Sequence, residues 1–122
     1  MDLHYLDFDY SEDADGTGTF DAMASVSPAQ IPVLHAEIAR VLAWAHQQFP
    51  DACGPSEEGG EWQYDLQGMQ EVATPLALQF DAASERIATV PGTPAPPRTT
   101  FTLSVSGTAG FCAALREAFG IG

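Results

Sequence analysis

The start of the chain is rich in aspartates, whose carboxylates are the first side chains in the sequence that could act in catalysis or binding. Asp7, Asp9 and Asp21 fall on one face of two expected strands, and Asp13 and Asp15 lie in the loop between them. A carboxylate pair supports acid–base catalysis when burial raises the pKa of one member. The alternation of residues places these acids on the exposed face instead. We therefore expect a solvated acidic face, available to a basic partner, rather than a catalytic site.

The acidic loop also has part of the spacing of a calcium site. Ser11, Asp13, Asp15 and Gly16 match the first, third, fifth and sixth positions of a helix–loop–helix calcium loop. The twelfth position is Ala22, where a bidentate glutamate is needed, and the flanking segments read as strands. We expect an acidic turn here and no metal site, with an irregular cation site as the weaker alternative.

Histidine and cysteine side chains offer a second candidate site. His35 and His46 lie on one flank of an expected helix, about 16 Å apart at 1.5 Å per residue, so they cannot share a metal ion. Cys53 follows in a loop, where nothing in its neighbourhood activates it as a nucleophile. With Trp44, these residues could line a pocket between helices and sheet. Two cysteines make neither a disulfide framework nor a structural zinc site, and we expect no cofactor.

The helix that carries these residues is the clearest element in the chain and lies within residues 27–50. Ser27, Pro28 and Gln30 predict an irregular first turn at 28–31, followed by regular helix from about 32 to 49. Glu37 and Trp44 lie on the flank opposite the histidines, and a half-exposed tryptophan there is typical of an interface or of a core boundary. The core-facing stripe recurs at spacings of three and four, in Ile31, Leu34, Ile38, Val41, Leu42, Ala45 and Phe49.

Alternating polar and apolar residues predict strands on both sides of this helix. The first two strands present their apolar residues on one face only if the loop between them has an odd number of residues. That register places Asp9 close to or opposite Asp21. A second helix is expected at 109–119, with Gly120 as its C-cap. The expected strands cover residues 2–10, 19–26, 62–67, 74–80, 87–90 and 98–106.

The order ββαββββα, with one short strand, predicts an α+β fold. We expect one domain over residues 1–122, built as a two-layer sandwich of an antiparallel sheet and two helices. In the fourth strand Leu76, Leu78 and Phe80 are expected to face the core. Gly68 is expected to mark a bulge or the end of the third strand.

Charge excludes several classes of partner. The chain has 17 acidic residues against four arginines and no lysine, for a net charge of −13 at pH 7. Binding of nucleic acid or an anionic membrane needs a basic face, so neither is expected. The start of the chain does not resemble a signal peptide, and no apolar run reaches the length of a membrane span. These features predict a cytoplasmic protein, and arginine as the only base suggests a bacterial source.

Function is predicted from charge alone, because no motif identifies an activity. Eight acids and no base precede Arg40, which favours a non-enzymatic interaction module that binds a basic protein. Small acidic bacterial immunity proteins, secretion chaperones and antitoxins share this size and charge, by analogy only. Two alternatives are a small-molecule or metal-binding pocket between helices and sheet, and a homo-oligomer, such as a dimer, joined through an edge strand or the Trp44 flank.

Overall fold

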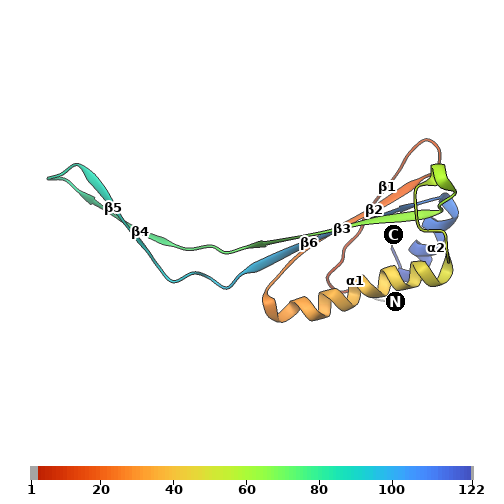
Figure 1. Cartoon of the computed structure of the whole chain (residues 1–122), viewed down its shortest axis with the longest axis horizontal. Coiled ribbons are helices and arrows are strands. Elements are labelled where there is room, and N and C mark those ends of the chain that lie inside the picture. Colours follow the sequence, from red (N-terminus) through yellow and green to blue (C-terminus); the bar gives the residue numbers. More distant parts are fainter. Residues whose placement is uncertain (1–2, 122) are drawn as a thin grey trace.

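A helix-covered sheet and a projecting hairpin make up the computed structural model, which describes residues 3–121 (Figure 1). The α+β class predicted from the sequence is confirmed. A four-stranded antiparallel sheet has the order β1-β2-β6-β3, and β4 and β5 form a separate two-stranded sheet. The elements are β1 (Asp9–Glu12), β2 (Gly18–Val26), η1 (Pro28–Gln30), α1 (Ile31–Gln48), η2 (Ser56–Glu58), β3 (Trp62–Glu71), β4 (Leu76–Asp81), β5 (Arg86–Pro91), β6 (Arg98–Gly107) and α2 (Ala109–Phe119).

The N-terminal strand is shorter than the sequence predicts. Alternation along the expected strand would place His4 on the same inward face as Leu6 and Phe8. Leu6 and Phe8 are buried, but residues 3–8 are irregular and His4 is exposed, so an inward His4 is wrong. The physical reason is that the backbone N–H groups from His4 to Leu6 bind the side chain of Glu37 on α1 instead of a neighbouring strand. Asp2, the first residue of the expected strand, lies outside the described residues.

The first hairpin has the predicted register. The loop between β1 and β2 contains five residues, 13–17, and Asp9 pairs directly with Asp21. An odd loop length keeps Phe20 and the other even-numbered residues of β2 on the buried face. Two acids are thereby fixed opposite each other on the outer face of the sheet.

The two helices build the core against one face of the four-stranded sheet (Figure 1). The short 3₁₀ turn η1 precedes α1, which confirms the predicted irregular first turn. Helix α2 begins at the N-cap Thr108 and ends at Gly120, whose left-handed φ of 65° confirms the predicted C-cap. The largest residues with no more than 1 % of their surface exposed come from both layers: Trp62, Phe20, Phe111, Leu34, Leu103 and Leu115.

Strand β3 continues through Gly68, so the bulge or strand end predicted there is wrong. Gly68 pairs with Phe101 of β6, and a Cβ at Gly68 would meet the Phe101 ring at 3.7 Å. The aromatic ring therefore lies over the glycine and shields the strand where a side chain is missing. Pairing with β6 extends to Glu71, at the end of β3.

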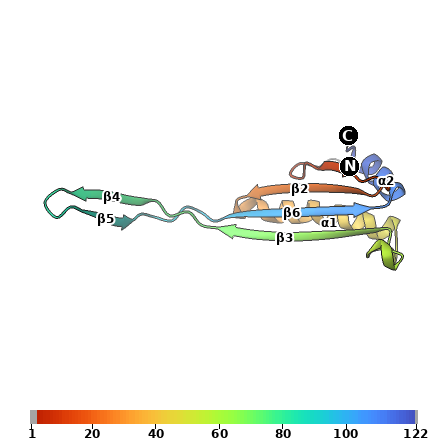
Figure 2. The same ribbon diagram turned by 90° about the horizontal axis from the view of Figure 1, so that it is seen from above.

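Beyond Glu71 the β3–β6 strand pair continues into an arm, which we define as residues 72–97. Backbone hydrogen bonds from Ala95 to Ala73 and from Gly92 to Pro75, both 2.8 Å, join the sheet to the β4–β5 hairpin. The arm projects away from both helices (Figures 1 and 2), and every residue from 63 to 96 is exposed. The arm is thus a single two-stranded ribbon without a covering layer.

The predicted core positions in β4 are wrong. Leu76, Leu78 and Phe80 are 56 %, 62 % and 69 % exposed. Their alternation does place them on one face of a strand, as the sequence indicates. That face lies beyond the reach of α1 and α2, so nothing in the described chain covers it (Figure 2).

Candidate functional site

Three of the acids form a row across the outer face of the four-stranded sheet. Asp9 pairs with Asp21, Asp21 pairs with Ser104 of β6, and Ser104 pairs with Asp65 of β3. The Ser104 hydroxyl donates a hydrogen bond of 2.6 Å to Asp21. The sequence analysis did not include Asp65, although its outward position follows from the alternation of β3. Helices cover only the other face, so this acidic row is open to solvent.

The other candidate acids lie apart from this row. Asp13 shapes the hairpin loop, because its Oδ1 accepts hydrogen bonds from the N–H groups of Asp15 at 2.9 Å and Thr17 at 3.0 Å. Asp15 is exposed in the same loop. Asp7 is exposed in the N-terminal segment and lines a surface hollow of about 540 Å³ beside the end of α2. Within residues 3–121, no three His, Cys, Asp or Glu residues are grouped so that they could hold a metal ion.

The candidate pocket residues do not meet in one cavity among the described residues. The His35 ring packs edge-on against Phe101, with centroids 5.1 Å apart, near the start of α1. The His46 ring packs against Trp62 at 4.8 Å, near the other end of the helix. Cys53 is exposed in the following loop and has an unpaired thiol. Their positions follow from the length of α1, which holds the two histidines three turns apart.

The two residues on the opposite flank of α1 are packed inside the fold. Trp44 is half-buried, and its ring contacts the rings of Phe49, Phe111 and Phe119 at centroid distances of 5.6–6.2 Å. It therefore lies at the core boundary. Glu37 is not on an exposed flank as the sequence suggests. It is only 2 % exposed, because its carboxylate is turned onto the backbone of the N-terminal segment.

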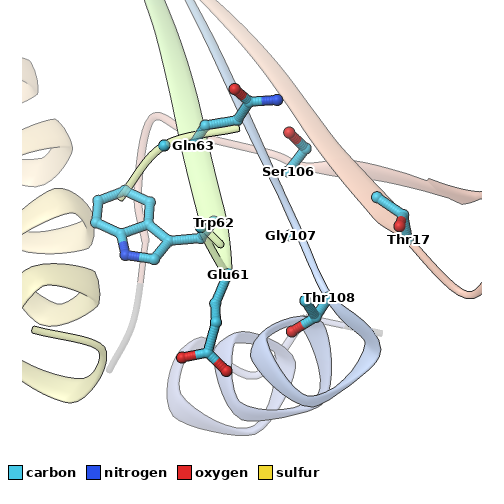
Figure 3. Close-up of a pocket in the computed structure, with 9 residues that line it drawn as sticks. Thr17, Glu61, Trp62, Gln63, Ser106, Gly107 and Thr108 are labelled. Carbon is cyan, nitrogen blue, oxygen red and sulfur yellow. The ribbon is translucent and has the colours of Figure 1, made fainter. Parts of the chain in front are cut away.

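A small hollow lies where β3, β6 and α2 meet (Figure 3). Its volume is about 40 Å³, enough for water but far below the roughly 300–1,000 Å³ of sites that enclose small molecules. The Thr108 N–H donates a 2.9 Å hydrogen bond to the Glu61 carbonyl at this point. In Figure 3 the Trp62 ring points away toward α1. The hollow is a small packing gap between these elements rather than a substrate site.

A larger apolar groove opens between α1 and the sheet. It has a volume of about 280 Å³ and is lined by His35, Ile38, Ala39, Leu42, Leu66 and Phe101. Apart from the histidine, its lining side chains have no polar atoms, so the groove cannot orient a polar substrate. Leu66 and its neighbour Tyr64 face the helix side of β3 but are 42 % and 44 % exposed. The groove therefore marks an incompletely covered edge of the core.

The arm presents a second apolar surface. The β4–β5 register pairs Leu78 with Thr89 and Phe80 with Ile87, which places these side chains on one face. The opposite face carries a more polar set, which includes Gln79 and Asp81. We call the first set the arm apolar face; it comprises Leu76, Leu78, Phe80, Ile87, Thr89 and Pro91.

Comparison of the chain with protein-family models, curated proteins and solved structures finds no match. In the described part of the chain, neither helix has the length and apolar character needed to cross a membrane.

The arm was missed by the sequence analysis, although one signal was present. The proline-rich residues 91–97 separate β5 from the last strand, and no helix lies between residues 62 and 107 to cover the hairpin.

Proposed function

We propose that this protein is a non-enzymatic protein-interaction module that docks through its projecting arm. The observation that carries the proposal is the arm apolar face, where Leu78, Phe80 and Ile87 are 62–69 % exposed. Contiguous exposed apolar surface on a folded domain marks a binding site, because leaving it in water is unfavourable.

The acidic row supports a second contact, with a basic partner, in the manner of a small bacterial immunity protein or chaperone. Asp9, Asp21 and Asp65 present three carboxylates on an uncovered sheet face. Such a surface accelerates association with a positively charged partner and makes the rate sensitive to salt. The free thiols of Cys53 and Cys112 support a reducing, cytoplasmic location.

Site-specific photo-crosslinking in the source cells tests the role of the arm. A photoreactive phenylalanine derivative replaces Phe80 on the apolar face, and in a matched control the same group replaces Gln79 on the opposite face. We expect covalent adducts with protein from position 80 and far fewer from position 79. Equal or absent adducts at the two positions would show that the arm apolar face does not dock, and the proposal would fail.

A further inference from the structure

We infer that the arm of one copy of this chain docks on the groove of a second copy, and that the two copies exchange arms reciprocally. This inference rests on the proposed docking role of the arm. Each copy presents the uncovered arm and the uncovered groove, so two copies satisfy both of these surfaces. The resulting dimer is closed by a twofold axis and leaves neither surface open for further growth.

The two surfaces match in chemistry. The arm apolar face offers Leu78, Phe80 and Ile87, and the groove offers Leu42, Leu66 and other apolar side chains. A groove of about 280 Å³ is below the roughly 300–1,000 Å³ of small-molecule sites and suits a few protruding side chains. Docking there removes apolar surface from water on both copies, which is the main favourable term in association.

Backbone pairing adds to this contact. Strand β3 lies at the edge of the four-stranded sheet. Within residues 3–121 its outer side is paired at Trp62, which bridges to the loop at residues 52–54, and no strand pairs with it beyond that point. An edge strand presents unpaired N–H and C=O groups that accept an added strand. An arm laid along β3, with its apolar face toward α1, extends the sheet and covers Leu66 and Tyr64 at the same time.

Charge restricts where two copies can meet. Each chain carries a net charge of −13, so most approaches between copies are repulsive. The arm contains only Asp81, Glu85 and Arg86 as charged residues, and the groove lining contains no acidic residue. The row that contains Asp9 and Asp21 lies on the other face of the sheet. Contact through arm and groove therefore joins surfaces that carry few charged residues. Asp65, at the β3 end of the acidic row, lies on the opposite face of that strand from the groove.

The buried area reaches that of a stable dimer only when both arms are exchanged. Burial of Leu76, Leu78, Phe80 and Ile87 removes on the order of 400 Å² of apolar surface, at roughly 100 Å² for each large side chain. An equal area buried on α1 and along the β3 edge, which includes the groove, brings one contact to about 800 Å², the size of a weak lattice contact, and two contacts to about 1,600 Å², a standard specific interface. Reciprocal exchange is therefore part of the inference.

The test measures the mass of the purified full chain by sedimentation velocity from low to high micromolar concentration. One variant combines Leu78→Ser with Phe80→Ser in the arm, and another, Ala39→Glu, places a carboxylate in the groove. Ala36→Glu is the matched control, because Ala36 is also exposed on α1 but does not line the groove. Circular dichroism and urea unfolding establish that each variant is folded.

We expect the natural chain and Ala36→Glu to be dimers, and both the arm variant and Ala39→Glu to dimerise at least tenfold more weakly. A dimer that is lost in the arm variant but kept in Ala39→Glu would overturn the inference, because the arms would then pack on each other. A natural chain that stays monomeric at every concentration would also overturn it.

Crosslinking from position 80 separates this inference from the proposed function. Adducts with residues 35–42 or 66 of another copy support both. Adducts only with a different protein support the docking role of the arm and overturn the second copy as its occupant. If position 80 gives no more adducts than the control position 79, the docking role of the arm itself is overturned.

Discussion

The carboxylate of Glu37 accepts a hydrogen bond of 2.7 Å from the backbone N–H of Leu6, 31 residues earlier in the chain. The same carboxylate accepts from the N–H groups of His4 at 2.9 Å and Tyr5 at 3.0 Å. Glu37 is 2 % exposed, so these three donors replace water around a buried carboxyl group. The N-terminal segment is thereby bound to α1 by one side chain, and Leu6 is held in the core.

Replacing Glu37 with glutamine should destabilise the fold. The amide of Glu37→Gln keeps one acceptor oxygen but turns an NH₂ group toward a backbone donor, which leaves buried polar groups unpaired. We expect a loss of roughly 1–3 kcal/mol in the free energy of unfolding, measured in urea. Glu117→Gln on the exposed side of α2 is the matched control and should change stability by less than about 0.5 kcal/mol. Equal stability of the two variants would contradict this account.

Local periodicity predicted the features that depend only on neighbours in sequence. The stripe of α1 and the Gly120 cap follow from residues within one or two helical turns. The register of Asp9 against Asp21 follows because an odd loop is the only way to keep both apolar sets on one face. These properties are local, so one sequence is enough to specify them.

The alternation of β3 predicts that Asp65 faces outward, but its place in the row of Asp9 and Asp21 could not be predicted, because it depends on the order of strands in the sheet. Asp65 joins the row of Asp9 and Asp21 only because β3 pairs with β6 rather than with β4. Strands that are sequential in the chain usually pair, which would place β3 beside β4. Strand order is decided by non-local packing, which the pattern of one strand does not report.

Leu78 and Leu103 show that the pattern of one strand does not predict burial either. Both alternate with polar residues in a strand, yet Leu78 is 62 % exposed and Leu103 is fully buried. Alternation indicates that one face is apolar but not which element covers it. Leu103 belongs to the core that the two helices build against the sheet, whereas Leu78 lies in β4, which projects beyond both helices (Figure 2).

Alanine substitution at these two leucines should change the free energy of unfolding by very different amounts. Leu103→Ala removes buried atoms and leaves a cavity, so we expect it to lower the free energy of unfolding by about 2–5 kcal/mol. Leu78→Ala removes atoms that are already hydrated and should change it by less than about 0.5 kcal/mol. Urea unfolding at sub-micromolar protein concentration makes the comparison, because dilution disfavours the inferred dimer. A large loss for Leu78→Ala under those conditions would mean that the arm packs against its own chain.

The two thiols should differ in reactivity. Cys53 is exposed, whereas Cys112 is buried and its Sγ donates a 3.4 Å hydrogen bond to the Gly107 carbonyl. Because the thiolate is the reactive form, burial, which raises the pKa of Cys112, protects it further. We expect one fast thiol in a chromogenic disulfide titration, absent in Cys53→Ser, and a second only in denaturant. Two fast thiols in the folded protein would contradict this.

The raised pKa of Cys112 also predicts an alkaline loss of stability. The folded state holds the thiol proton more tightly than the unfolded state does, so stability is constant below the unfolded pKa and falls as pH rises through the folded one. The decline should begin near pH 9, the ordinary value for this thiol. Burial also raises the pKa of Tyr10, so Cys112→Ala should make the decline shallower without abolishing it. Urea unfolding between pH 7 and 10.5 measures the slope.

Asp9 and Asp21 are paired directly across two strands, and their like charges should lower the stability of the fold. A neutral residue at either position should therefore raise it. Like charges directly across an antiparallel pair repel, so we expect Asp9→Asn to raise the free energy of unfolding by about 0.2–1 kcal/mol at low ionic strength. The gain should shrink in 1 M salt, where the screening length is about 3 Å. Asp7→Asn, outside the strand ladder, is the control and should show little gain. No gain for Asp9→Asn would mean that water already screens the pair.

The same variant distinguishes a functional acidic row from one that only keeps the protein soluble. If the row binds a basic partner, Asp9→Asn should slow association with that partner and flatten its salt dependence, even though the protein is more stable.

Dimerisation through arm and groove should depend on salt in the opposite sense from binding of a basic partner, because salt screens the repulsion between two chains of charge −13. Sedimentation of the natural chain at low and high salt should therefore show a tighter dimer as salt rises. A dimer that weakens with salt would mean that charged residues, and not the apolar surfaces, join the two copies.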